Sequence, residues 1–472
     1  MAPSVAAHCR PADAPSRHSR SRFANTNGDR AFTALLPCCG PSERVAQAAR
    51  RRSMGAVVAR QPGVLIIVEN LTVPLDRRVW QEASSLRDAG YTVSVVCPKG
   101  GRYTASYEVL DGIHVFRHPL PFEADGALGY ALEYSWALAW ETALSIKAQA
   151  KVGFDVIQAC NPPDTIFLLA GLWKAFLGTP FVFDHHDINP ELYEAKFGRR
   201  GFFHKLLLTL ERWTFRTADV SIATNDTFKA IAVERGGMDP DRVFVVRSIP
   251  DVSRFKRVAP DAALKNGREH LVGYVGIMGA QDGVDLLVEA MAELVHGRDG
   301  RPGRHDTQCL IVGSGTELAG LRQLTHTRGL DDYVTFTGFL SGEPLLRAFS
   351  TFDIGVIPDP KNGYNDKISM NKVFEYMSLG IPFVSFDLVE GRIVAGDAAL
   401  YAADASPAAL AVRITELADD AEKRRQLGEV GLERARRLLR WDAEAARLLA
   451  AHELAMSLTP AARRAARDAV AG

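Results

Sequence analysis

The sequence predicts an α/β protein built from two doubly wound domains, each a parallel sheet with helices on both faces. Short β-branched runs such as Val64–Val68 and Thr92–Cys97 alternate with amphipathic stretches such as Arg78–Ala89. This alternation is typical of βαβ units, whose crossover helices cover a parallel sheet. The chain has 472 residues, more than one hydrophobic core accommodates, and this length favours two or three domains.

Composition changes along the chain predict the domain boundaries. Residues 1–61 are rich in Arg, Ser, Ala and Pro and lack periodicity, so we expect a disordered tail there. We expect a Rossmann-like N-terminal domain over 62–250 and a second Rossmann-like domain over 251–437, with a cleft between them. The segment 438–458 is expected to form a helix that crosses back onto the first domain, and 459–472 a frayed basic end.

The second half repeats the βα pattern of the first. Strands are expected at Val272–Val275, Cys309–Val312, Val334–Thr337, Ile354–Ile357 and Phe383–Ser385, and the last long helix over Arg434–Leu458. In Val284–Val295, the residues Val284, Leu287, Met291 and Leu294 share one helix face, which predicts a buried amphipathic helix.

Charge, cysteine content and hydropathy exclude several classes. The 56 basic residues balance the 56 acidic ones, which gives no argument for nucleic-acid binding. The six cysteines form no C-x-x-C pair, so a reducing compartment is favoured, no zinc site is predicted, and Cys97 and Cys309 are interpreted as buried thiols. The sequence has neither an apolar run long enough to span a bilayer nor a secretory signal. We therefore expect a cytoplasmic protein that can also bind peripherally to a membrane.

The stretch Asp366–Pro382 carries the strongest chemical signal. Ser369 or Asn371 can cap a helix whose N-terminus offers free N–H groups to an anion. Lys367 and Lys372 add positive charge there, and Glu375 lies one turn into the helix. Lysines for phosphate and a carboxylate for sugar hydroxyls are what nucleotide-sugar recognition needs.

This stretch resembles the C-terminal signature of retaining glycosyltransferase family 4, which has the two-domain GT-B fold. In that family two glutamates lie eight positions apart in a segment ending E-x-M-x-x-G-x-P. Glu375 matches the second glutamate, which the resemblance places on the nucleotide ribose, whereas Lys367 stands at the first, which contacts the transferred sugar. The form Asn371-Lys372-Val373-Phe374-Glu375-Tyr376-Met377 is similar to a known subgroup.

A glycine loop adds to this resemblance, which covers about Gly63 to Leu449. Gly276 and Gly279 match the loop in which backbone approaches a diphosphate. The family's Arg and Lys are replaced by Ile277 and Asp282, so we expect Lys367 and Lys372 to supply the missing charge. By the same match, backbone beside Gly338 and Phe339 contacts the base.

In the first domain, Phe183–Tyr193 follows a strand, at the sheet edge where α/β folds place ligands. The resemblance places His186 on the donor sugar or acceptor, with Asp187 and Glu191 shaping the site. The adjacent histidines are disfavoured as a metal site because neighbouring side chains in a strand point apart. For His185, a position in the hydrophobic core and a position in the site are equally favoured.

Two further segments predict acceptor contacts. Asn70, Arg77 and Arg78 follow the first strand, where the arginines are expected either to meet an anionic acceptor or to be plain surface residues. Lys196–Arg216 interleaves basic and aromatic residues, as does a helix lying on an anionic membrane, although packing onto the sheet explains its apolar residues equally well.

The expected reaction is glycosyl transfer, with retention, from a nucleoside-diphosphate sugar to a glycan or lipid-linked acceptor. His186, Asp187 and Lys367 are the expected catalytic residues, and neither a cofactor nor a metal is expected. Two alternatives stay open: a nucleotide-sugar 2-epimerase of the same fold, and a non-catalytic binding subunit, suggested by Lys367, Ile277 and Asp282.

Overall fold

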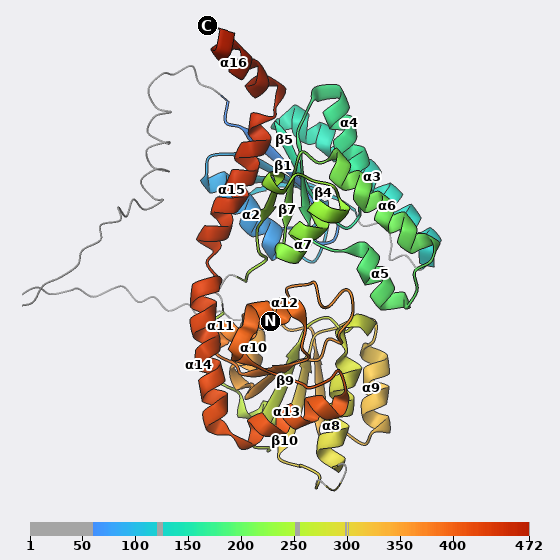
Figure 1. The fold of residues 1–472 in the computed structure, drawn as a ribbon, viewed down its shortest axis with the longest axis vertical. Coiled ribbons are helices and arrows are strands. Elements are labelled where there is room, and N and C mark those ends of the chain that lie inside the picture. Colours follow the sequence, from blue (N-terminus) through green and yellow to red (C-terminus); the bar gives the residue numbers. More distant parts are fainter. Residues whose placement is uncertain (1–59, 120–125, 251–254, 298–299, 301, 472) are drawn as a thin grey trace, which may run out of the picture. The chain divides into compact units, whose positions relative to one another are not determined.

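The structure is a computed structural model that describes residues 60–119, 126–250, 255–297, 300 and 302–471. The predicted α/β class is confirmed: the chain contains two sheets whose strands are parallel except for one edge strand (Figure 1). The predicted tail lies outside the described residues except for Arg60 and Gln61. Among the described residues, no helix has both the length and the hydropathy required to cross a bilayer.

The first sheet has eight strands in the order β3-β4-β2-β1-β5-β6-β7-β8. They are β1 (Gly63–Ile67), β2 (Thr92–Pro98), β3 (Tyr107–Leu110), β4 (Ile113–His118), β5 (Val156–Cys160), β6 (Phe181–His185), β7 (Val220–Ala223) and β8 (Val243–Val245). Its helices are α2 (Arg77–Asp88), α3 (Gly126–Lys151), α4 (Phe167–Leu177), α5 (Asn189–Phe197), α6 (Phe202–Thr217) and α7 (Asp226–Ala230), followed by the turns η1 (Ile231–Arg235) and η2 (Pro240–Arg242). Side chains of α2 pack on one face of this sheet, and those of α3, α4 and α6 pack on the other.

The second sheet has six parallel strands in the order β11-β10-β9-β12-β13-β14. They are β9 (His270–Val275), β10 (Thr307–Val312), β11 (Val334–Gly338), β12 (Ile354–Ile357), β13 (Phe383–Ser385) and β14 (Ala399–Tyr401). The helices are α8 (Val284–His296), α9 (Leu318–Thr327), α10 (Gly342–Thr351), α11 (Asn371–Leu379), α12 (Val389–Ala395), α13 (Pro407–Asp419) and α14 (Ala421–Leu438), with the short turns η3 (Ala262–Lys265), η4 (Ala280–Asp282) and η5 (Gly396–Ala398).

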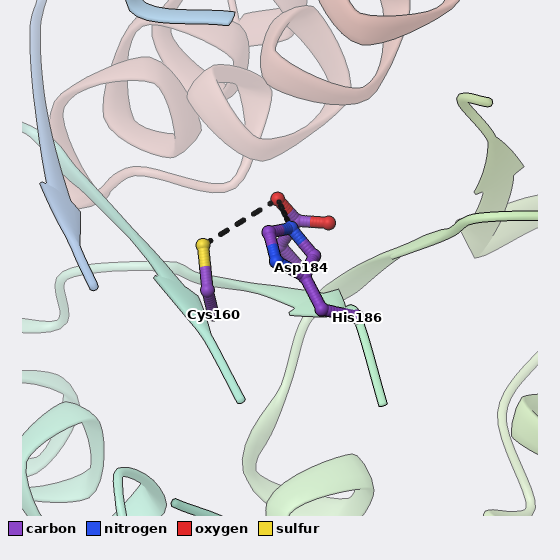
Figure 2. A group of neighbouring side chains, drawn as sticks. All are labelled: Cys160, Asp184 and His186. Atoms are coloured by element: carbon purple, nitrogen blue, oxygen red, sulfur yellow. Dashed lines mark hydrogen bonds and ion pairs between the residues drawn. The ribbon is translucent and has the colours of Figure 1, made fainter. Parts of the chain in front are cut away.

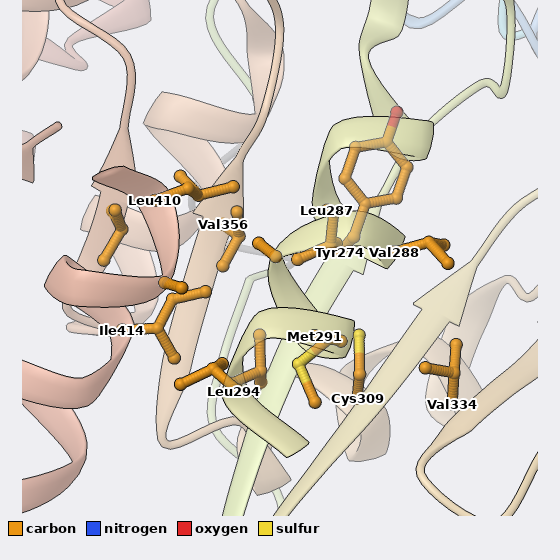
Figure 3. Packing of buried hydrophobic residues seen from close by; sticks show 14 of the residues in the cluster. Tyr274, Leu287, Val288, Met291, Leu294, Cys309, Val334, Val356, Leu410 and Ile414 are labelled. Carbon is orange, nitrogen blue, oxygen red and sulfur yellow. The ribbon is translucent and has the colours of Figure 1, made fainter. Parts of the chain in front are cut away.

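Hydrophobic packing holds α8 and α13 against one face of the second sheet (Figure 3). Leu287, Met291 and Leu294 of α8 are buried, as the helical periodicity of the sequence predicts, and they pack in one cluster with Ile414 of α13. Burying a side chain of this size contributes about 1.5–3 kcal/mol. Cys309 lies in the same cluster, so its thiol is buried in the core and is not accessible for reaction.

The C-terminal helices differ from the single helix expected over Arg434–Leu458. The helix breaks after Leu438, and α15 (Trp441–Ser457) begins anew. Leu439 and Arg440 leave the helical conformation, with ψ of 65° and 96°. Leu439 packs into the second-domain core, whereas Leu448 of α15 packs into the first-domain core. Trp441 Nε1 donates to Ser85 Oγ of α2 at 2.9 Å, which ties the start of α15 to the first domain.

The terminal segment 459–472 is not frayed as expected but contains α16 (Pro460–Ala471). Thr459 Oγ1 accepts a hydrogen bond from Ala462 N at 3.2 Å, which is a helix N-cap. Proline is tolerated at the next position, and the alanines that follow have the highest helix propensity.

Glu141 on α3 is a buried carboxyl group whose two oxygens have no hydrogen-bond partner in the described chain. Burial raises the pKa of Glu141 to about 7. The unfolded value is near 4.5, so the native state binds the extra proton between these values and stability falls as pH rises from 4.5 to 7. We expect Glu141→Met to stabilise the protein more at pH 8 than at pH 5, by about 2–3 kcal/mol.

Urea denaturation at the two pH values measures this difference. Asp155→Asn is not a suitable control because Asp155 accepts a hydrogen bond from Gly63 N. Glu422→Met, at an exposed residue of α14, is suitable, and it should give no such pH dependence. An equal effect of Glu141→Met at both pH values would contradict the assignment of a buried, unpaired carboxyl.

Candidate nucleotide and sugar site

The loops after β9, β10 and β11 are joined by backbone hydrogen bonds at the carboxyl edge of the second sheet. Met278 N donates to Ser314 O at 3.0 Å, and Gly313 N donates to Gly338 O at 2.9 Å. A Cβ on Gly313 would stand 1.8 Å from Gly276 O, and its φ of 138° is strained for other residues. Glycine is therefore required at 313 for the close approach of these two loops.

The two replaced positions of the glycine loop differ in orientation. Ile277 is 70% exposed, so an apolar side chain faces solvent at the position where the family has a charged residue. Asp282 turns into the loop, where its Oδ2 accepts from Gly279 N at 2.9 Å and from Gln281 Nε2 at 3.1 Å. Asp282 thus shapes the loop that contains Gly279. Phe339 beside β11 is 76% exposed, an open aromatic face next to these loops.

Helix α11 begins at Asn371, but neither predicted side chain caps it. Met370 occupies the N-cap position and forms no side-chain cap bond. Ser369 is engaged elsewhere, because its Oγ donates to Glu390 and accepts from Asn225 Nδ2 at 3.2 Å. The first N–H groups of α11 are consequently left without a side-chain acceptor, which suits an anion.

Lys372 has a protein partner, contrary to a lysine reserved for a diphosphate. Its Nζ lies 3.0 and 2.7 Å from the two carboxylate oxygens of Asp359 and 4.8 Å from the Tyr274 ring centroid. Burial disfavours the ammonium, but Asp359 outweighs that cost and raises the pKa of Lys372. The pair is buried and nearly neutral, so Lys372 supplies less free charge than the sequence implies.

Glu375 lies one turn into α11 and is almost fully buried. Burial raises the pKa of Glu375 to about 7, although Arg77 and Lys372 act in the opposite direction. Arg77, the first residue of α2, approaches it from the first domain, with NH2 3.6 Å from Glu375 Oε1. Arg77 was expected to face an acceptor; in this structure it faces the residue expected to bind the ribose.

Lys367 is paired with Glu191 of the first domain, with Nζ 2.8 Å from Oε1. Arg235 holds Glu191 from the other side through NH1 at 2.7 Å and also contacts Glu211 at 2.7 Å. Burial opposes ionisation of Glu191, but Arg235 and Lys367 outweigh it and lower the pKa of this carboxyl. Arg235 and Glu211 are site residues that sequence reasoning missed.

Two more contacts bring the domains together beside this pair. Tyr364 OH donates to Asp187 Oδ1 at 3.3 Å, and Asn225 Nδ2 donates to Lys367 O at 2.8 Å. Asn225 also caps α7 through Phe228 N, so its position is fixed. The structure therefore pairs Glu191 with Lys367 and links Asp187 to Tyr364, a neighbour of Lys367 in the chain.

Arg78 is not a surface arginine and does not face an acceptor. It is buried, and its NH2 lies 3.0 Å from Asp184 Oδ1 while its Nε lies 3.1 Å from Glu82 Oε1. Burial alone would lower the pKa of Arg78, but Asp184 and Glu82 outweigh burial and raise it. Arg78 therefore neutralises the buried carboxylate of Asp184, whereas burial and the neighbouring Asp184 raise the pKa of Glu82. Asn70 is exposed in the loop after β1, as an acceptor contact requires.

Asp184 connects Arg78 to His186. Its Oδ2 lies 2.8 Å from His186 Nε2 and 3.6 Å from Cys160 Sγ (Figure 2). Although Cys160, Asp184 and His186 could together ligate a metal ion, Arg78 already provides the positive charge. Burial raises the pKa of the Cys160 thiol, which keeps it protonated and a poor metal ligand.

His185 points the other way, into the first-domain core. Its ring packs 5.3 Å from Phe183, 5.1 Å from Phe215 and 4.9 Å from Phe228, measured between ring centroids. Burial lowers the pKa of His185 to about 3, so the ring is neutral. Of the two interpretations that the sequence left open for His185, the structure favours the core histidine.

Comparisons with known proteins agree with this geometry. Residues 75–248 match the protein family described as "Glycosyl transferase 4-like domain", and residues 269–420 match the family described as "Glycosyl transferases group 1". Alpha-D-kanosaminyltransferase from Streptomyces kanamyceticus is 25% identical over 323 residues, which cover 66% of this chain and 80% of the relative.

Two solved structures share the fold. Sucrose-phosphate synthase from Thermosynechococcus elongatus has a TM-score of 0.67 at 21% identity, covering 84% of this chain and 98% of that one. HepE from Anabaena, solved in complex with UDP and glucose, has a TM-score of 0.63 at 16% identity, covering 83% and 99%. With a glycosyltransferase 4-like domain followed by a group 1 domain on this two-sheet framework, the chain belongs to the glycosyltransferases of GT-B fold.

Proposed function

We propose that the protein transfers a glycosyl unit, with retention, from a nucleoside-diphosphate sugar to an acceptor hydroxyl. The observation that carries this proposal is the arrangement at the carboxyl edge of the second sheet. There the close-packed glycine loops, the open N-terminus of α11 and the buried Glu375 adjoin one another. Phosphate fits the N–H groups, and ribose hydroxyls fit the carboxylate.

The charges support separate roles for the two domains: the second domain holds the diphosphate, and the first domain contacts the sugar. Lys372 is balanced by Asp359 and Lys367 by Glu191, so backbone N–H groups and the α11 dipole bear most of the diphosphate charge. His186 and Asp187 come from the first domain and meet the sugar. The leaving diphosphate takes the acceptor proton, which requires no separate nucleophile. The catalytic task is then to stabilise developing charge by fixed dipoles.

A thermal-shift panel tests the donor assignment. Nucleoside diphosphates and nucleotide sugars with different bases are each added to the full chain, with the corresponding nucleosides as controls. We expect one base series to raise the melting temperature, with the diphosphates exceeding the nucleosides, because binding to the native state alone stabilises it. If no nucleotide sugar or diphosphate changes the melting temperature, the donor assignment fails.

For the acceptor we propose a glycan or lipid-linked molecule reached from an anionic membrane surface. Exposed apolar side chains gather on the neighbouring helices α4 and α6: Leu168, Leu172, Phe176, Leu177, Phe202, Phe203, Leu206 and Trp213. The Phe167 ring of α4 lies 5.7 Å from the Trp213 ring of α6, so the two helices form one surface. Arg199, Arg200, Lys205 and Arg212 are exposed on or beside it.

Co-sedimentation with anionic vesicles tests this α4–α6 surface. Each basic residue near an anionic bilayer contributes about 1 kcal/mol, so we expect binding at low salt that weakens as salt rises. Replacing both Phe176 (80% exposed) and Phe202 (75% exposed) by Ser should weaken binding further. The matched control Ile393→Ser, at an exposed apolar residue of α12, should not. Absence of binding at low salt would contradict the membrane proposal.

A further inference from the structure

The two lysines expected at the diphosphate are both paired with carboxylates. Lys372 Nζ lies 2.7 Å from Asp359 Oδ2, and Lys367 Nζ lies 2.8 Å from Glu191 Oε1. Lys372 is buried, so turning it toward a ligand would leave Asp359 as an uncompensated buried charge, which is strongly destabilising. These lysines therefore offer a ligand little free positive charge.

The glycine loop after β9 does not add positive charge. Ile277 is uncharged, and the acidic Asp282 accepts a hydrogen bond from Gly279 N at 2.9 Å. The open N-terminus of α11 contributes about half an elementary charge. A diphosphate carries more negative charge than that, so the site needs a cation from elsewhere in the chain.

Arg77, the first residue of α2, places a guanidinium beside α11 from the first domain. Its NH2 lies 3.6 Å from Glu375 Oε1, and its Cζ lies 5.9 Å from the centroid of the Phe255 ring. Phe255 packs in the same hydrophobic cluster as Met370 and Val373, the N-cap and the third residue of α11. Two independent contacts thus place this guanidinium next to α11.

Arg77 is held loosely, in contrast to its neighbour Arg78. The side chain of Arg77 is 56% exposed, and its 3.6 Å contact is longer than a hydrogen bond. Arg78 is buried, and its NH1 and NH2 lie 2.9 Å from Val246 O and 3.0 Å from Asp184 Oδ1. The guanidinium of Arg77 therefore keeps its N–H donors available, and its planar fork fits two phosphate oxygens at once.

Glu375 indicates where a ligand lies relative to Arg77. It is 6% exposed, yet its carboxylate accepts no hydrogen bond from the described part of the chain. A buried carboxylate in this state is costly unless a ligand supplies the donors. Asn371, the first residue of α11, lies one turn before Glu375 on the same helix face. A ligand that joins Glu375 to the N-terminus of α11 therefore passes beside Arg77.

We propose that Arg77 is a phosphate-binding residue of the donor site, whose guanidinium donates hydrogen bonds to the diphosphate at the N-terminus of α11 and supplies positive charge that Ile277 and Asp282 do not. The inference deepens the proposed function and rests on it for the presence of a diphosphate. Because Arg77 belongs to the first domain, the diphosphate contacts both domains.

Isothermal titration at pH 8 tests this role with whichever of UDP, GDP and ADP binds the unmodified chain best, and with the corresponding nucleoside. Arg77→Gln should weaken binding of the diphosphate by at least about tenfold and leave binding of the nucleoside unchanged, because charge-assisted hydrogen bonds to phosphate are lost. Arg77→Lys, which keeps the charge, should recover part of the loss. Arg87→Gln, near the other end of α2, is the matched control and should bind both ligands as the unmodified chain does. Equal losses for diphosphate and nucleoside in Arg77→Gln would overturn the inference.

A double-mutant cycle separates a phosphate contact from an effect through Glu375. If Arg77 contacts the diphosphate, Arg77→Gln should still weaken its binding by at least about tenfold in a chain that carries Glu375→Ala. If Arg77 only neutralises Glu375, Arg77→Gln has no further effect in that chain, and this result would overturn the inference. Arg77→Gln alone should not change the melting temperature without nucleotide, because the side chain is exposed.

Failure of this inference is distinguishable from failure of the proposed function. An unmodified chain that binds neither a nucleoside diphosphate nor a nucleotide sugar refutes the proposed function and the inference together. A chain that binds a nucleoside diphosphate equally well with and without Arg77→Gln refutes the inference alone and leaves the donor assignment in place.

Discussion

Replacing Arg78 by Met should destabilise the protein by about 3–5 kcal/mol, since removing one partner of a buried ion pair leaves the other charge uncompensated. Arg78 is the cation that faces Asp184 and Glu82, which are both fully buried. Its NH1 also donates to Val246 O at 2.9 Å, so a backbone carbonyl would lose its donor as well. The shift of the urea denaturation midpoint measures the effect.

Arg77 provides the matched control for this experiment. It precedes Arg78 in the same helix turn, but its side chain is 56% exposed and its contact with Glu375 is long, at 3.6 Å. Exposed ion pairs contribute about 0–1 kcal/mol, so Arg77→Met should change stability little. A loss of stability in Arg78→Met as small as that in Arg77→Met would show that the network around Asp184 does not depend on Arg78.

Replacing Glu375 by Ala should weaken donor binding by about 1–3 kcal/mol, the value of charge-assisted hydrogen bonds to ligand hydroxyls. Because burial raises the pKa of Glu375 to about 7, its carboxylate is lost as pH falls through that value. Donor affinity of the unmodified chain should therefore be lower at pH 6 than at pH 8. Isothermal titration with the nucleotide that the thermal-shift panel selects measures both effects.

In Glu375→Ala this pH dependence of donor affinity should disappear. Glu422→Ala, at an exposed residue of α14, is the control and should bind as the unmodified chain does. Donor affinity that is unchanged in a correctly folded Glu375→Ala chain would remove Glu375 from the site.

Much of the framework follows from local sequence. The alternation of β-branched runs and amphipathic stretches predicts both sheets, and periodicity predicts the buried face of α8. The antiparallel hairpin β3–β4 is absent from the sequence prediction, although the sequence contains a signal for it. Asp111-Gly112 lies between two strand-like runs and adopts positive φ angles of 46° and 81°. An Asp-Gly pair in this setting is typical of a tight hairpin turn.

The charge partners could not be predicted, because they join distant parts of the chain. Arg235 lies 44 residues from Glu191, and Lys367 lies 176 residues from it. Lys372 and Asp359 are 13 residues apart, but no local pattern indicates that they share a buried position. The sequence therefore predicts which residues carry charge at the site, whereas the fold decides how much of that charge stays free for a ligand.

Acceptor-dependent release of the nucleoside diphosphate is the measurement that tests the central claim most directly. The chain is supplied with the selected nucleotide sugar, with and without an acceptor sugar or lipid-linked acceptor, and the released diphosphate and the glycosylated product are both quantified. Sugar transfer predicts release that depends on the acceptor and equals product formed. Donor turnover without acceptor and with an epimerised sugar as product, or donor binding without turnover under any acceptor, would contradict the claim.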